Sequence, residues 1–227
     1  TGIITVKNDG PEQLNDLKGV VSVASGFTES DLKVNFTLPK TTMAVGESIS
    51  VPVSVRMPQK LDGVNRALSA VAVNVASVTF SATPAVTGGS VSGATKLDLK
   101  AENNLEIKDV KVRFNGESES VDNDDTVDNM KPGQTVEFEI ELENRFKEKE
   151  DVTIEDIELR VVSNGDLDID EDEDVGDLGP EDKETIKLSS VIDDEADAGT
   201  FDVEITVEGT DEFGARHGEK WIIKFEI

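Results

Sequence analysis

The stretch Val136-Glu137-Phe138-Glu139-Ile140-Glu141-Leu142-Glu143 decides the fold class, because apolar and acidic residues alternate strictly along it. Successive side chains of an extended strand point to opposite faces, so the apolar residues share one face and the carboxylates share the other. The same period of two recurs in residues 201–207 and 221–227. Each of these segments therefore predicts a β-strand with one face in a core and the other in water.

Two further segments keep this period but change face midway. In residues 105–114 the apolar positions shift parity across Lys108-Asp109, and in residues 152–161 they shift across Glu155-Asp156. Such shifts predict β-bulges or strand bends. Turn residues separate the runs, and from Leu105 onward about seven short strands are expected. This pattern predicts an all-β chain and an immunoglobulin-like sandwich, here without any cysteine to form its disulfide.

The charge of the chain changes abruptly near its middle. Residues 1–100 carry eight Asp and Glu against nine Lys and Arg, a balance of +1, whereas residues 101–227 carry 41 against 13, a balance of −28. A chain of 227 residues is long enough for two domains of roughly 100 residues each. We therefore predict one domain at 1–101 and a second, acidic domain at 102–227, both immunoglobulin-like sandwiches in tandem.

The first half repeats the second half without its beginning. Residues 4–8 (ITVKN) match residues 140–144 (IELEN), and residues 17–23 parallel residues 157–162. Nothing in residues 1–101 corresponds to residues 105–114, so the first sandwich is predicted to lack its opening strand. A missing strand would leave unpaired N–H and C=O groups and an uncovered apolar groove.

Two explanations fit a missing strand. A neighbouring molecule could add the strand, and residues 105–114 are the only strand of this chain that we expect to be exchangeable. Alternatively, the chain was cut from a longer array of tandem modules in which the strand lies upstream. The Ala- and Val-rich, almost uncharged residues 67–91 favour the first explanation, because they suggest a surface against which other molecules pack.

Turn chemistry supplies a resemblance. The turn Lys131-Pro132-Gly133-Gln134 ahead of residues 136–142, the strand that ends at Asn144, and the closing hairpin of residues 208–217 (EGTDEFGARH) carry it. They resemble the immunoglobulin-like modules repeated in archaeal S-layer and secreted surface proteins, and the bacterial cell-adhesion-related repeats. The likeness is good over residues 105–227 and loose over residues 1–101. It implies a structural role outside the cell, as a spacer, a lattice or filament subunit, or an adhesive stalk.

The residue inventory argues against an enzyme. The chain has no Cys, no Tyr and one His, His217, which we expect at the tip of a hairpin as a turn residue without a partner. No phosphate-binding glycine loop, nucleophile elbow or zinc spacing is present. A net charge of −27 would repel nucleic acid and anionic membranes, and no run reaches the ~18 apolar residues that predict a membrane-spanning segment.

Two candidate sites remain. Asp166, Asp168, Asp170, Asp172 and Asp174 lie at alternate positions, and an extended backbone would stack their carboxylates on one face, where Ca²⁺ could relieve the repulsion. The alternative is a solvated acidic edge. The triplet Asn35-Phe36-Thr37 is a sequon for N-linked glycosylation on an expected strand, although such triplets also arise by chance.

The sequence thus predicts an extracellular, non-enzymatic structural subunit at the cell surface. We expect it to assemble into a filament or lattice by strand complementation, as a homopolymer or with neighbouring surface-protein modules. The alternative is a Ca²⁺-dependent adhesion or ligand-binding module from a longer tandem-repeat surface protein. Neither interpretation involves nucleic acid or direct membrane insertion. No cofactor is firmly predicted, and Ca²⁺ is the one candidate.

Overall fold

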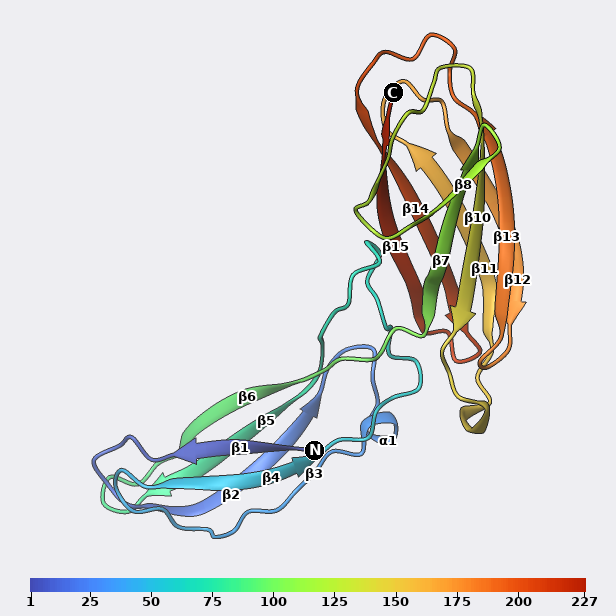
Figure 1. The fold of residues 1–227 in the computed structure, drawn as a ribbon. Coiled ribbons are helices and arrows are strands. Elements are labelled where there is room, and N and C mark those ends of the chain that lie inside the picture. The colour runs from blue at the N-terminus through green and yellow to red at the C-terminus, as the bar shows by residue number, and fades with distance from the viewer. The chain divides into compact units, whose positions relative to one another are not determined.

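The computed structural model describes residues 1–227, and β-strands make up most of it (Figure 1). The predicted all-β class is confirmed. The helical segments α1 (Glu29–Leu32) and the 3-10 turn η1 (Glu148–Glu150) are single turns, and no helix is long and apolar enough to cross a membrane. The chain divides into two compact units, of which the first comprises Thr1–Leu61 and Ala72–Lys100 and the second comprises Asp62–Val71 and Ala101–Ile227.

The second unit contains two sheets around one core. One sheet has the strand order β13-β10-β7-β8 and the other has the order β12-β11-β14-β15-β9. Inward side chains of both sheets form a single cluster, in which the rings of Phe138 and Phe225 stack with centroids 6.0 Å apart. The strands are β7 (Leu105–Phe114), β8 (Glu117–Val121), β9 (Thr126–Val127), β10 (Thr135–Asn144), β11 (Ile154–Ser163), β12 (Asp170–Leu178), β13 (Lys183–Val191), β14 (Thr200–Asp211) and β15 (Arg216–Glu226).

Both predicted parity shifts occur as irregularities of the ladders. The register between β10 and β7 shifts after Glu141, which pairs with Asp109, to Leu142, which pairs with Ile107. The registers of β11 shift between Glu155 and Glu158. Each extra residue lets the apolar side chains on both sides of it face the core, so each strand keeps one apolar face buried on either side of its bulge.

The first unit contains two three-stranded sheets, β1-β4-β3 and β2-β5-β6. Its core is smaller and includes Leu17, Val51 and Phe80. β5 is the central strand of its sheet, and alternate residues of it are buried. The low charge of residues 67–91 comes in part from this buried central strand, but the segment also contains exposed apolar residues such as Val86 and Val91. The packing surface expected in this segment stays a prediction. The strands are β1 (Gly2–Lys7), β2 (Leu14–Val23), β3 (Asn35–Phe36), β4 (Ser48–Ser54), β5 (Val73–Pro84) and β6 (Val91–Leu99).

The two units share a local device at the end of one strand. Asn8, after β1, is 2% exposed, and its side-chain amide donates to the carbonyl oxygens of Glu12, Met43 and Ala44 while its Oδ1 accepts the N–H of Gly10. Asn144, at the end of β10, is fully buried and makes the corresponding bonds: Nδ2 donates to Val152 and Leu178, and Oδ1 accepts the N–H of Phe146. Each asparagine thus ties two loops to its strand end.

A second device repeats in the strand that follows. Asp16 in β2 and Asp156 in β11 both have a positive φ, 53° and 52°, and each lies inside a register shift against the next strand. The residue after each of them, Leu17 and Ile157, is buried in the core of its unit. β1 is therefore the structural counterpart of β10, and β2 the counterpart of β11.

Candidate functional site: an open edge groove in the first unit

β1 has an unpaired edge where its counterpart has none. β10 pairs with β13 on one side and with β7 on the other, whereas β1 pairs with β4 alone. The absent neighbour of β1 is thus the equivalent of β7. Within the first unit, no other strand of the described chain occupies that position.

The backbone groups along this edge follow from the alternation of an antiparallel ladder. The N–H of Asn8 donates to the carbonyl oxygen of Glu47 at 2.9 Å, so Asn8 directs its backbone groups toward the β4 side. Alternate residues bond in the same direction, and those between them bond in the opposite one. Ile3, Thr5 and Lys7 therefore direct their N–H and C=O groups away from β4, toward the open side.

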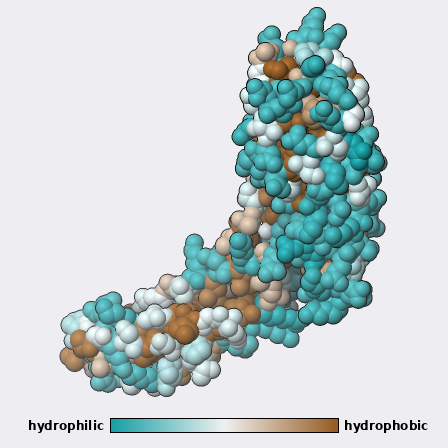
Figure 2. All heavy atoms as spheres, in the orientation of Figure 1, coloured by the Kyte–Doolittle hydropathy of each residue, from teal (hydrophilic) through white to brown (hydrophobic).

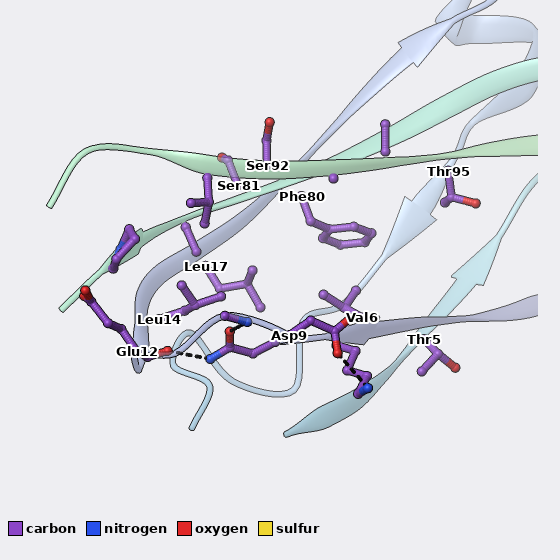
Figure 3. Close-up of a pocket in the computed structure, with 18 of the residues that line it drawn as sticks. Thr5, Val6, Asp9, Glu12, Leu14, Leu17, Phe80, Ser81, Ser92 and Thr95 are labelled. Atoms are coloured by element: carbon purple, nitrogen blue, oxygen red, sulfur yellow. Dashed lines mark hydrogen bonds and ion pairs between the residues drawn. The ribbon is translucent and has the colours of Figure 1, made fainter. Parts of the chain in front are cut away.

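An apolar groove lies beside this edge. A cavity of about 600 Å³ opens between β1 and β6, and apolar side chains including Val6, Leu14, Leu17 and Phe80 line it. In Figure 3 the side chains of these four residues surround the hollow. A second cavity of about 430 Å³ shares Ile4, Thr5 and Thr95 with the first, so the groove continues toward Thr1.

The exposure of side chains shows what the groove lacks. Ile140 and Leu142 of β10 are fully buried, whereas Ile4 and Val6, at the matching positions of β1, are only half-buried. Figure 2 shows brown, apolar residues on the surface of the first unit, while the surface of the second unit is mostly teal. The first unit thus leaves apolar side chains in water that the second unit covers with β7.

β7 itself is paired on both sides and buried within the second unit. It pairs with β10 and with β8. Its inward side chains lie within the core of that unit, with exposures between 0% and 7%: Leu105, Ile107, Val110, Val112 and Phe114. β7 therefore could not fill the groove of the first unit without first opening the core of the second unit.

The five aspartates of the predicted cation site do not share one extended strand. Asp166 and Asp168 lie in the loop before β12, and Asp168 has a φ of 54°. Asp170, Asp172 and Asp174 lie in β12, an edge strand, where the guanidinium of Arg160 bonds the carboxylate of Asp170 at 2.8 Å. No group of three or more His, Asp or Glu side chains anywhere in the chain is placed to hold a metal ion.

The glutamates of β10, in contrast, are matched by cations. Glu137, Glu139, Glu141 and Glu143 form a row on the outer face, with basic side chains of β7 on one side and of β13 on the other. Glu139, for example, lies 2.8 Å from Arg113 and 3.3 Å from Lys187, and these cations hold the pKa of its carboxyl below the ordinary value. This face therefore contributes little to the net negative charge of the unit.

The expectation that His217 is a turn residue is wrong. It is the second residue of β15, is 2% exposed, and its Nε2 lies 3.4 Å from a carboxylate oxygen of Asp211. Its Nδ1 accepts the N–H of Asn104 at 3.2 Å, so the ring is neutral with its proton on Nε2. Burial lowers the pKa of this imidazole. The pair joins the end of β14 to the start of β15 within the hairpin.

Asn35, the sequon residue, opens β3 and is exposed, and its side-chain amide donates to the carbonyl oxygen of Lys33 at 3.0 Å. The residues that line the groove on β6, such as Gly93 and Thr95, had no sequence signal, because small residues on a strand do not indicate a cavity. The chain matches no protein-family model and no curated protein sequence.

Proposed function

We propose that the first unit is an acceptor for a β-strand supplied by another protein molecule, and that the chain is a structural subunit of an extracellular filament or lattice joined in this way. The observation that carries the proposal is the open edge of β1 over an apolar groove, at the position that β7 fills in the second unit. Main-chain hydrogen bonds to an edge strand provide affinity, and side-chain pockets provide specificity.

The groove has the character of a strand site and lacks that of a catalytic site. Its polar members include Thr5, Ser81 and Thr95. Its charged members are Lys7 and Asp9, which form an exposed ion pair at 2.6 Å, and Glu12, whose carboxylate accepts the backbone N–H groups of Val86 and Thr87. No nucleophile and base converge in it. An extended peptide with apolar side chains at alternate positions would satisfy both the backbone edge and the apolar floor.

Exchange of β7 between copies of the chain is the less favourable source of the strand. Removal of β7 would expose five buried apolar side chains. At about 1.5–3 kcal/mol for each, the loss is on the order of 10 kcal/mol, which is comparable to the entire stability of a typical domain. We therefore assign the strand to a different surface-protein module, and homopolymers formed by exchange are an outcome that the test distinguishes.

The extracellular location is supported by the resemblance of residues 105–227 to modules of archaeal and bacterial surface proteins. The charge of the second unit agrees with a role in which that unit stays solvated and apart from other surfaces. Calcium-dependent adhesion, the alternative that the sequence suggested, gains no support from the placement of the aspartates.

Strand addition can be tested with a peptide taken from the chain itself. The peptide LEIKDVKVRF has the sequence of β7, which fills the equivalent slot of the second unit. Hydrogen exchange of the full chain is measured with and without the peptide, and we expect slower exchange at Ile3, Thr5 and Lys7. The control is a peptide of the same composition in which apolar and polar residues exchange parity.

Three results would count against the proposal. Exchange along β1 could stay unchanged at about millimolar peptide, a concentration at which weak β-strand addition is still detectable. The control peptide could protect β1 equally well. Sedimentation of the chain alone could reveal dimers, and hydrogen exchange could show that β7 is less protected in them. This would identify a second copy of the chain as the donor in place of a different module.

A further inference from the structure

The groove of the first unit and the space that β7 fills in the second unit are bounded by equivalent strands, but different side chains line them. The strand registers align Ala82↔Val91 with Gly209↔His217. Counting along the strands from there, three inward residues of β6 correspond to three residues of β15: Val91 to His217, Gly93 to Glu219 and Thr95 to Trp221. Two of the three are much smaller in the first unit.

The large residues of the second unit reach toward β7. The carboxylate of Glu219 accepts the N–H of Ile107 at 2.7 Å, so this side chain lies beside the backbone of β7 at Ile107. Trp221 is partly buried and packs against the same core. The Glu219 side chain thus occupies space directly beside β7.

The first unit has nothing in place of the Glu219 side chain. A Cβ added at Gly93 would meet no atom within 4 Å, so the space above this residue is open. Phe80, paired with Gly93 across the ladder, presents its ring to the groove, as Figure 3 shows. A strand with the side chains of β7 would therefore leave a void over Gly93, and voids in a core reduce stability in proportion to their volume.

On the basis of the proposed strand-acceptor function, we infer that the occupant carries a bulky side chain, aromatic or long aliphatic, at the position that faces Gly93. This position corresponds to Ile107 of β7. An aromatic ring there would fill the open space and would meet the ring of Phe80, a favourable aromatic contact. The partner is thus a strand of apolar-alternating pattern that is distinguished from β7 by its size at one position.

The test combines two peptides with three proteins. The peptides are LEIKDVKVRF and its Ile107→Phe variant, and the proteins are the natural chain, Gly93→Leu, which fills the space, and Ser92→Leu, which adds the same side chain on the outer face of β6. Calorimetric titration gives the affinities. We expect the Phe peptide to bind the natural chain about tenfold more tightly, a difference of the size that filling a cavity provides. We expect this preference to persist in Ser92→Leu and to vanish in Gly93→Leu.

The outcomes separate this inference from the proposal beneath it. If neither peptide binds the natural chain, strand acceptance itself is wrong. If both bind with equal affinity, or if the preference survives in Gly93→Leu, strand acceptance stands and the inference about size is wrong. A series of Val, Leu and Phe at the same peptide position, measured on the natural chain alone, gives the same decision if Gly93→Leu unfolds the first unit.

Discussion

Substitution of Asn144 by alanine should destabilise the second unit severely. The side chain is fully buried, donates two hydrogen bonds to the carbonyl oxygens of Val152 and Leu178, and accepts one from the N–H of Phe146. Alanine would leave the two buried carbonyl groups and the partly buried N–H without these partners. An unsatisfied buried group costs about 1–3 kcal/mol, so the two carbonyl groups alone give an expected loss of about 2–6 kcal/mol.

Trp221 allows this loss to be measured. It is the only tryptophan of the chain and is packed against the core of the second unit, so urea unfolding followed by its fluorescence reports on that unit. The matched control is Asn164→Ala, because Asn164 also accepts a backbone N–H, from Asp202 at 2.9 Å, but is exposed. The control should lose less than about 1 kcal/mol, since water replaces the lost partner.

A small effect would refute the reasoning. If the free energy of unfolding of Asn144→Ala lay within about 0.5 kcal/mol of that of the natural chain, the stability of the loops would not depend on the buried amide. The claim that Asn8 and Asn144 are equivalent anchors would then lose its energetic content. A loss in both variants of similar size would show that burial of the amide is not the cause.

Three further predictions concern other features. Burial lowers the pKa of His217 below the ordinary value near 6.5, so the unfolded chain binds the proton before the folded chain does as the pH falls. The free energy of unfolding should therefore decrease as the pH drops through about 6.5. Urea midpoints of the natural chain and of His217→Gln between pH 7.5 and pH 5.5 test this, and an equal pH dependence of the two would contradict it. Gly63→Ala would bring a Cβ to 2.7 Å from the carbonyl oxygen of Glu102 and 3.0 Å from Nδ1 of His217, so it should speed hydrogen exchange in residues 62–71, and unchanged exchange there would argue against the packing. Since no cluster of three or more acidic side chains is placed to hold a cation, thermal unfolding of the chain should not shift with Ca²⁺ up to about millimolar concentration, and a rise of several degrees would restore the aspartates as a site.

Strand positions and bulges could be predicted because they depend on local alternation. The parity shifts at 108–109 and 155–156 each left a trace in the order of apolar residues, and each became a bulge. The repeat of Asn8 and Asn144 was also readable, since the same residue type ends both strands. The structure extends that repeat to a turn: the N–H of Glu47 bonds the carbonyl oxygen of Ala44, as the N–H of Asp182 bonds that of Gly179.

Long-range features could not be predicted in the same way. The buried pairing of His217 with Asp211 depends on the fold of a hairpin whose side chains look like ordinary turn residues in the sequence. Residues 62–71 belong to the second unit although the chain reaches them between β4 and β5 of the first. The groove itself depends on small residues such as Gly93, whose effect appears only once Phe80 and β1 are placed around them.

The acidic edge strand β12 has a consequence for how copies of this protein meet at high concentration. Its exposed row of aspartates and glutamates would bring like charges face to face if two such edges approached, so side-by-side growth of the second unit is discouraged. β1 carries no acidic residue at all. The open edge of β1 therefore favours association, whereas the acidic edge of β12 opposes it. Any aggregate of this protein should begin at the edge of β1 and should disperse when another strand covers that edge.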